Sequence, residues 1–209
     1  MNTLQTDRVN NTLDVLHNDA KNDFMRMSKG MIKSVFRPMQ PDDFKDAYLP
    51  ISREQGKEIR KIIVENNLKN VVEFGTSFGI STIYLADAVR ITGGKVITTE
   101  LLESKAIKAK KNIDDAGLSD YVEIRTGDAM ETLKIFSKPI DFLFLDGWKD
   151  LYLPLFQQLE PQFRKGTLIY ADNMDMSGTQ NYASYVQNKK NEYNTKSIYN
   201  GKAFLSKFL

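Results

Sequence analysis

Cysteine is absent from the 209-residue sequence, and histidine occurs once, at His17. The first absence excludes disulfide bonds, cysteine-ligated zinc, iron–sulfur clusters and thiol nucleophiles. The scarcity of histidine disfavours a metal site built on imidazole ligands, and also a Ser-His-Asp triad. Any chemistry must therefore depend on oxygen-bearing side chains, on lysine or on a bound cofactor.

The sequence also has no apolar run long enough to cross a membrane and no apolar core of a signal peptide. We therefore expect a cytoplasmic protein without a membrane partner. Its 29 basic and 27 acidic residues leave a net charge of +2, which does not by itself indicate nucleic-acid binding. The length and a hydrophobic content of 41% are typical of one globular domain.

Apolar residues recur at helical spacing near the amino terminus, as at Leu13, Leu16 and Phe24. This pattern predicts two or three amphipathic helices. We interpret residues 1–50 as a helical cap or lid, and residues 51–209 as the main domain.

From Ser52 onward, strand and helix patterns alternate. The predicted strands are 70–74, 95–99, 121–125, 140–145 and 167–171, and the predicted helices are 52–66, 80–89, 103–116, 129–136 and 151–163. Such alternation implies βαβ units, and hence a parallel sheet with helices on both faces. Two further strands flank Asn200-Gly201, a dipeptide typical of a type I′ turn. We therefore expect an α/β fold whose mostly parallel, seven-stranded sheet ends in an antiparallel hairpin.

Acidic or glycine residues follow each of the five parallel strands, where an open α/β sheet binds its ligands. They are Glu73 to Gly75, Glu100, Gly127-Asp128, Asp146-Gly147 and Asp172-Asn173. An acid or glycine at every strand end is more than chance loop composition predicts, so this edge is the candidate site.

The loop after the first strand contains Gly75 and Gly79 but lacks the G-x-G-x-x-G spacing that a pyrophosphate needs. This disfavours a nicotinamide or flavin dinucleotide and is compatible with S-adenosyl-L-methionine, which has no phosphate. Ser77 or Ser81, with the amides at the helix start, would then hold the methionine carboxylate. A tight strand-to-helix turn without a ligand explains the loop equally well.

Glu100 ends the second strand, where an acid can bind both ribose hydroxyls. We favour this role over that of an exposed acid stabilised by the dipole of the next helix. Asp128 and Ala129 either face the adenine, or Asp128 simply caps the helix that follows.

Asp146, Asp172 and Asn173 follow the fourth and fifth strands. Neighbouring strands lie about 4.8 Å apart, so these side chains can converge on one cation if the two strands are adjacent. Three hard oxygen ligands suit Mg²⁺. The alternative is an Asx turn at Asp172-Asn173 and a helix cap at Asp146.

Two residues beside Asp146 also have two interpretations. Trp148, the only tryptophan, is either a core residue or one wall of a pocket for an aromatic substrate. Lys149 is either an exposed lysine or, beside a metal and a sulfonium that disfavour its protonation, a general base.

At these residues the sequence resembles the metal-dependent O-methyltransferases of the catechol and caffeoyl-CoA type, including their small bacterial members. LDGWKDLYLP (145–154) and KGTLIYADN (165–173) are similar to the family's two metal segments. VVEFGTSFGIST (71–82) and TTEL (98–101) are similar to its cofactor loop and ribose acid. The likeness covers roughly residues 49–173 and implies a Rossmann-like class I methyltransferase fold.

The resemblance also implies roles for individual residues. S-adenosyl-L-methionine would contact Leu49, Ile51, Glu73, Gly75, Ser77, Ser81, Glu100, Leu101, Asp128, Ala129, Asp146 and Trp148. Mg²⁺ or another divalent cation would bind Asp146, Asp172 and Asn173, and Lys149 would act as the catalytic base beside Asp146.

Two positions depart from the family pattern. Ala203 stands where the catechol enzymes carry an acid for the second substrate hydroxyl, and Gly147 replaces a histidine of the mammalian enzyme. The first departure argues against catechol itself. We therefore expect methyl transfer to the hydroxyl of a small aromatic acceptor.

Two alternatives stay open, and a homodimer is compatible with either. One is a tRNA hydroxyuridine-type O-methyltransferase, for which basic residues are available at Lys21, Arg26, Lys29, Lys33 and Arg37. The other is a non-catalytic module that binds S-adenosyl-L-methionine.

Overall fold

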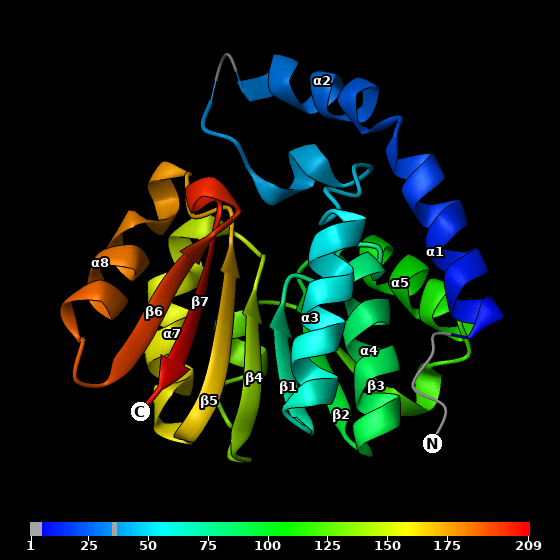
Figure 1. Cartoon of the computed structure of the whole chain (residues 1–209). Helices are drawn as coiled ribbons and strands as arrows, with labels where there is room; N and C mark the ends of the chain where they lie inside the picture. Colours follow the sequence, from blue (N-terminus) through cyan, green and yellow to red (C-terminus); the bar gives the residue numbers. More distant parts are fainter. Residues whose placement is uncertain (1–5, 35–36) are drawn as a thin grey trace.

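Seven strands form one sheet in the order β3-β2-β1-β4-β5-β7-β6 (Figure 1). The computed structural model describes residues 6–34 and 37–209, apart from the side chains of residues 29–34. The strands are β1 (Asn70–Phe74), β2 (Lys95–Glu100), β3 (Val122–Thr126), β4 (Ile140–Leu145), β5 (Phe163–Asp172), β6 (Tyr193–Ile198) and β7 (Ala203–Phe208). The first five pair in parallel, and β7 pairs antiparallel to both β5 and β6. The expected α/β sheet with its final antiparallel hairpin is confirmed.

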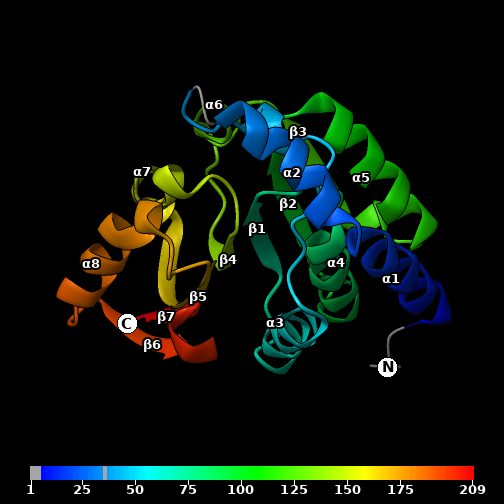
Figure 2. The same cartoon turned by 90° about the horizontal axis from the view of Figure 1, so that it is seen from above.

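Helices cover both faces of this sheet (Figure 2). They are α1 (Asp7–Ala20), α2 (Asp23–Ser34), α3 (Arg53–Glu65), α4 (Ile80–Thr92), α5 (Glu103–Asp115), α6 (Ala129–Thr132), α7 (Tyr152–Leu159) and α8 (Gln180–Asn188). Alternate strand residues point to opposite faces. Val71 and Phe144 accordingly pack with α1, α3 and α4, whereas Val72 and Leu143 pack with α7 and α8.

Two predicted helices are shorter than their apolar patterns indicate. The helix expected over 129–136 ends at Thr132, and Phe136 is buried in the loop that follows. The helix expected over 151–163 is α7, followed by a 3-10 turn over Glu160–Gln162 that contains Pro161. A proline has no backbone N–H for the helical hydrogen bond, which explains the early end of α7.

The predicted type I′ turn at Asn200-Gly201 is wrong. The last β6–β7 pair is Ile198 with Ala203, so the connection has four residues and includes a 3-10 turn over Tyr199–Gly201. Asn200 and Gly201 do adopt the positive φ expected of them. Two contacts of the connection explain its extra length. The Lys202 carbonyl accepts from the Met174 amide, and the Tyr199 hydroxyl donates to Glu58 on α3 at 2.7 Å.

The N-terminal region contains α1, α2 and a 3-10 turn over Pro41–Phe44, in agreement with the predicted helical segment. Leu13 and Leu16 belong to the same core cluster as α3 and α4, so α1 is packed on the main domain. Helix α2 lies above the end of the sheet where the parallel strands finish (Figure 1). The lid role of residues 1–50 stays a prediction.

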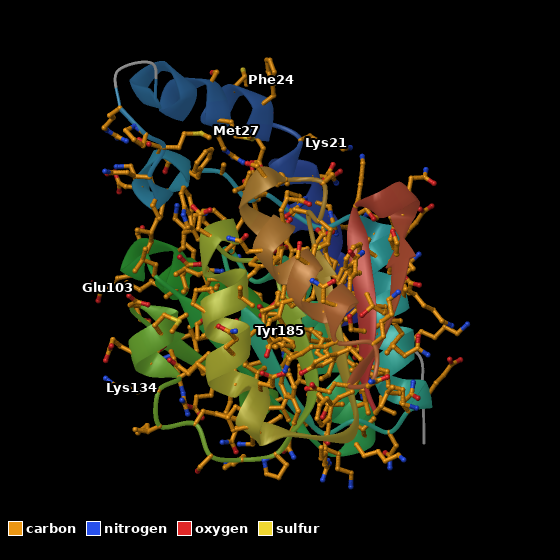
Figure 3. The ribbon with its side chains drawn as sticks, turned by 90° about the vertical axis from the view of Figure 1, so that its left-hand side faces the viewer. Lys21, Phe24, Met27, Glu103, Lys134 and Tyr185 are labelled. Atoms are coloured by element: carbon orange, nitrogen blue, oxygen red, sulfur yellow. The ribbon has the colours of Figure 1, made fainter. Side chains whose placement is uncertain are left out.

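Phe24 does not follow the predicted apolar pattern: it is 84% exposed and points away from the molecule (Figure 3). Lys29 and Lys33, named above as candidate basic contacts, have side chains outside the described part of the chain. None of the helices in the described ranges is both long and apolar enough to cross a bilayer.

Helix α3 begins as predicted, because the Ser52 hydroxyl accepts from the Gln55 amide and the Gln55 side chain accepts from the Ser52 amide. The next residue, Gly56, faces the ring of Tyr84 on α4. A Cβ atom at Gly56 would lie 2.4 Å from two carbons of that buried ring. The missing side chain therefore allows α3 to approach α4, which fixes the position of Gln55 at the edge of the sheet.

Gly56→Ala tests this close approach. Alanine is the better helix former by about 1 kcal/mol, but overpacking a buried ring costs about 1–3 kcal/mol. A Cβ contact of 2.4 Å is far inside van der Waals distance, so the cost should lie near the upper end, at about 2–3 kcal/mol. We expect a net decrease of about 1–2 kcal/mol in the free energy of unfolding, measured by urea denaturation. The decrease should disappear in a Tyr84→Leu background, and a Gly56→Ala protein as stable as the wild type would contradict the packing argument.

Candidate active site

The sheet order changes direction between β1 and β4, and the residues that follow these two paired strands lie side by side at the carboxyl edge of the sheet. The Asp146 amide donates to the Phe74 carbonyl at 2.9 Å, so the loop after β4 continues alongside β1. A Cβ at Gly75 would lie 2.7 Å from the Asp146 carbonyl oxygen, and Gly75 has a φ of +104°. Only glycine fits this contact without displacing the backbone. In doubly wound sheets such a switch point is where ligands bind.

Asp146 and Lys149 form an ion pair at this edge of the sheet. The Lys149 Nζ donates to Asp146 Oδ1 at 3.1 Å and to the Tyr152 hydroxyl at 3.0 Å. Both charged side chains are largely shielded from solvent, with exposures of 18% for Lys149 and 13% for Asp146. The alternative that Lys149 is an exposed lysine is therefore wrong, as is a helix-cap role for Asp146, because α7 has no side-chain cap.

Tyr152, which was not predicted from the sequence as a site residue, connects the two strand ends. Its buried hydroxyl lies 2.9 Å from the Leu145 carbonyl oxygen on β4 and 3.1 Å from the Asp172 carbonyl oxygen on β5. In sequence, Tyr152 is indistinguishable from an ordinary core aromatic of an amphipathic helix.

Asp172 ends β5 next to Asp146 and receives a hydrogen bond from α3. The Gln55 Nε2 donates to Asp172 Oδ1 at 2.9 Å. Gln55 was not predicted as a site residue; its single amide group both caps α3 and orients the carboxylate. Asn173 follows with a positive φ of 56°, the left-handed conformation that asparagine tolerates.

Electrostatics at the two carboxylates favour the binding of a positive charge. Burial raises the pKa of Asp146 to about 7, opposed by Lys149 and reinforced by the negative charge of Asp172. Burial also raises the pKa of Asp172, opposed by the Asn173 amide and Lys149. Two neighbouring carboxylates thus have one ammonium group between them.

The described part of the chain contains no group of three or more histidine, cysteine, aspartate or glutamate side chains placed to hold a metal. The predicted ligand set does not require such a group, because it has two carboxylates and one amide. Strands β4 and β5 are adjacent, with Leu145 paired to Ala171, so the residues that follow them lie side by side. Oxygen donors beside an excess of negative charge fit a hard divalent cation.

The loop before α4 has the features of a carboxylate site. Gly79, at the N-cap of α4, has a φ of 87° and no side chain with which to cap the first-turn amides. The Ser77 hydroxyl, however, donates to the Tyr48 carbonyl at 2.8 Å, and Ser81 is mostly buried. The helix start therefore fits the methionine carboxylate better than the Ser77 hydroxyl does.

Glu100 lies under this loop and is 9% exposed, so the alternative of an exposed acid is wrong. Its carboxylate accepts from the Ser77 amide at 2.8 Å and from the Leu102 amide at 2.9 Å. Burial raises its pKa, opposed by the Leu102 amide and the charge of Lys105. Glu73 is fully buried instead, with its carboxylate bound by the Thr82 hydroxyl.

The remaining predicted contacts lie around the same edge. Leu49 and Leu101 are about half exposed, Ile51 and Ala129 are buried, and Trp148 is half-buried against the core cluster of α7 and α8. Asp128 accepts from the Met130 amide at 2.8 Å and so caps α6, as its alternative interpretation held. Their contacts with a cofactor stay predictions.

Comparisons with known proteins agree with this geometry. Residues 72–174 match the family described as "Methyltransferase domain". An O-methyltransferase from Bacillus cereus, solved in complex with SAH, has a TM-score of 0.70 and 25% identity, over 88% of this chain and 90% of that one. The chain thus has the fold of the Rossmann-like methyltransferases and matches the model of their domain.

Several curated proteins that the chain resembles are catechol O-methyltransferases. Catechol O-methyltransferase of Niastella koreensis is 39% identical over 134 residues, which are 62% of this chain and 60% of the relative. The mouse catechol O-methyltransferase is 31% identical over 150 residues, 68% of this chain and 56% of the relative. The chain thus matches less than two thirds of the length of these relatives. Over the matched part, the chain is similar to catechol O-methyltransferases.

Tyr152→Phe tests whether the tyrosine hydroxyl holds the strand ends together. Removing a buried hydrogen-bonding group leaves its partners unpaired, so we expect the free energy of unfolding to fall by about 1–3 kcal/mol. Tyr185→Phe is the matched control, because the Tyr185 hydroxyl donates to Glu160 at a half-buried position where water can replace it. A smaller loss is expected there, and equal losses in thermal and urea denaturation would refute a special role for Tyr152.

Proposed function

We propose that this chain transfers the methyl group of S-adenosyl-L-methionine to a hydroxyl oxygen of a small aromatic acceptor, with the help of a divalent cation. The observation that carries the proposal is the convergence of Asp146, Lys149 and Asp172 at the switch point beside the Gly75 loop. The similarity to catechol O-methyltransferases adds support for the cofactor and for oxygen as the atom that is methylated.

Each residue of the candidate site has a defined task in such a reaction. Asp146, Asp172 and Asn173 would hold the cation, which lowers the pKa of a bound hydroxyl. Lys149 Nζ, one hydrogen bond from Asp146, is placed to accept the proton that the acceptor hydroxyl loses. Glu100 and the start of α4 would hold the cofactor, so that its methyl and the acceptor oxygen are aligned.

The balance of atoms is simple. In such a transfer the oxygen would form a bond to the methyl carbon as the carbon–sulfur bond breaks, which would leave S-adenosylhomocysteine. The acceptor proton would pass to Lys149 as the neutral amine, after its ammonium has released a proton to solvent beside the bound cation and the sulfonium.

The neighbouring hairpin bears on the acceptor. Ala203, at the position of the acid in catechol enzymes, pairs with Asp172 across β5 and β7 and is fully buried. No carboxylate is available at that point for a second substrate hydroxyl. We therefore favour an acceptor that reacts through one hydroxyl and does not need a second one for recognition.

The cap region gives little support to an RNA acceptor. Arg26 forms ion pairs with Asp19 at 2.9 Å and with Asp23 at 3.2 Å, and Arg37 pairs with Asp43 at 2.7 Å. These arginine charges are neutralised within the protein, which reduces the attraction for phosphates.

A methyl-transfer screen tests the proposal directly. We expect labelled S-adenosyl-L-methionine to methylate monohydroxylated aromatic acids in the presence of Mg²⁺ and not after chelation. Catechols and bulk tRNA are the comparison acceptors. Activity on tRNA alone would replace the proposed acceptor class, and binding of S-adenosylhomocysteine without transfer to any hydroxyl would indicate a non-catalytic module.

Lys149→Ala tests the proton acceptor. General-base catalysis contributes about 100-fold or more, so kcat should fall by at least that factor, while the Kd for S-adenosylhomocysteine changes little. Lys165→Ala, at an exposed lysine near the opposite end of β5, is the control and should retain full activity. An unchanged kcat in Lys149→Ala would rule out the assigned role.

A further inference from the structure

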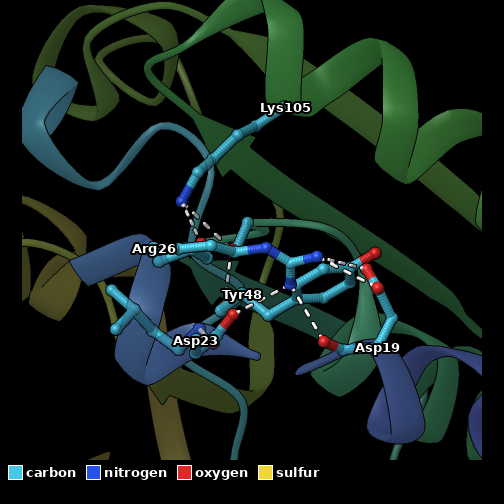
Figure 4. A network of polar contacts seen from close by, with 8 residues as sticks. Asp19, Asp23, Arg26, Tyr48 and Lys105 are labelled. Carbon is cyan, nitrogen blue, oxygen red and sulfur yellow. Dashed lines mark hydrogen bonds and ion pairs between the residues drawn. The ribbon is translucent and has the colours of Figure 1, made fainter. Parts of the chain in front are cut away.

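Lys105 on α5 is a buried cation that the proposed reaction does not use. It is 5% exposed, although it lies in the first turn of an amphipathic helix whose other lysines face solvent. Its Nζ donates to the Ala47 carbonyl at 2.9 Å and to the Ser77 hydroxyl at 3.3 Å (Figure 4). Burying an ammonium group costs free energy unless the group is hydrogen-bonded. These two hydrogen bonds therefore offset the cost of burying Lys105.

The Ala47 carbonyl belongs to a segment, Ala47–Leu49, that we call the strap. Three of its backbone groups form hydrogen bonds to side chains from three different segments of the chain. Lys105 binds the Ala47 carbonyl, the Ser77 hydroxyl donates to the Tyr48 carbonyl at 2.8 Å, and the Leu49 amide donates to Asp23 on α2 at 2.8 Å. The strap thus joins the N-terminal helices to the cofactor loop.

Ring contacts support the same arrangement. The Tyr48 ring packs at a tilt against Phe78 of the cofactor loop, with ring centroids 4.3 Å apart. The Arg26 guanidinium lies 5.2 Å from the centroid of the Tyr48 ring (Figure 4). Leu49 has a φ of 49°, which is uncommon for a residue with a branched side chain. A strained residue persists where its neighbours hold it, and here the strap bonds do so.

Charge links Lys105 to the predicted ribose acid. Burial lowers the pKa of Lys105, while the negative charges of Glu100, Asp23 and Asp46 oppose that shift. Glu100 is in turn stabilised as a carboxylate by Lys105. One ammonium group therefore contacts the strap and the Ser77 loop, and it compensates the charge of the acid beneath them.

We propose that Lys105 is a positioning residue of the cofactor pocket, which fixes the strap against the Ser77 loop and holds Leu49 and Glu100 in place for S-adenosyl-L-methionine. The proposal rests on the cofactor binding in the proposed function. It adds a residue whose effect is on cofactor affinity and not on the methyl-transfer step.

Lys105→Met tests the proposal, because methionine keeps most of the volume and removes the charge and the donors. Lys108→Met is a matched control: Lys108 is exposed one turn further along α5, and its Nζ lies 5.2 Å from the same Phe78 ring that Lys105 approaches at 5.3 Å. We expect S-adenosylhomocysteine to bind about tenfold more weakly to Lys105→Met in calorimetry. Lys108→Met should bind like the wild type.

Two further measurements separate positioning from general destabilisation. Hydrogen exchange of the amides in residues 47–51 should become faster in Lys105→Met without cofactor, while the amides of β4 and β5 are unchanged. At saturating cofactor, kcat should stay within about twofold of the wild type, with the effect confined to KM.

If Lys105→Met does not fold, Lys105→Gln serves in its place, because glutamine keeps a donor for the Ala47 carbonyl. For Lys105→Gln we expect the same weaker binding and faster hydrogen exchange, but smaller changes in both. Wild-type affinity together with unchanged exchange in the variant that folds would overturn the proposal. Failure of the wild type itself to bind S-adenosylhomocysteine would instead overturn the proposed function, and the role of Lys105 with it.

Discussion

The parallel pairing of β4 with β5 is the constraint on which the candidate site depends. Leu145 pairs with Ala171, so the next residue of each strand is an aspartate at the same edge of the sheet. A shift of one residue would turn every side chain of one strand to the opposite face. The Tyr152 hydroxyl, within hydrogen-bond distance of a carbonyl on each strand, stabilises this register where the ladder ends.

The site is a local concentration of charge that the rest of the fold must compensate. Asp146 and Asp172 are buried together, which is unfavourable for two carboxylates, and their partners come from different elements: Lys149 after β4 and Gln55 on α3. Gly56 permits the close approach of α3 that brings Gln55 within reach. Gly56 does not contact the candidate site itself, yet it affects how the Asp172 carboxylate is oriented.

The part of the candidate site around the Ser77 loop is organised differently, around one buried cation. Lys105 contacts the strap and the Ser77 hydroxyl, and the Ser77 amide donates to Glu100. The proposed metal site is therefore built on regular strands with short connections, whereas the proposed cofactor site depends on contacts between loops. We expect the proposed cofactor site to respond more strongly to changes in the N-terminal region.

Local patterns in the sequence determined the order of strands and helices, the residues at the strand ends and the start of α3. These features depend on side-chain periodicity and on turn residues within a few positions of one another. The identity of the strand-end residues, such as Asp146 and Asp172, was sufficient to predict an oxygen-rich site. The hairpin turn was predicted wrongly because Tyr199 is drawn to Glu58, a partner 141 positions away.

Only the tertiary structure decided which groups complete the site. Gln55 meets Asp172 across 117 positions, and Lys105 meets Ala47 across 58 positions. In the sequence each of these residues fits an ordinary local role, as a helix cap or as a lysine of an amphipathic helix. Their second role depends on burial and on long-range packing, which no periodicity within a single segment records.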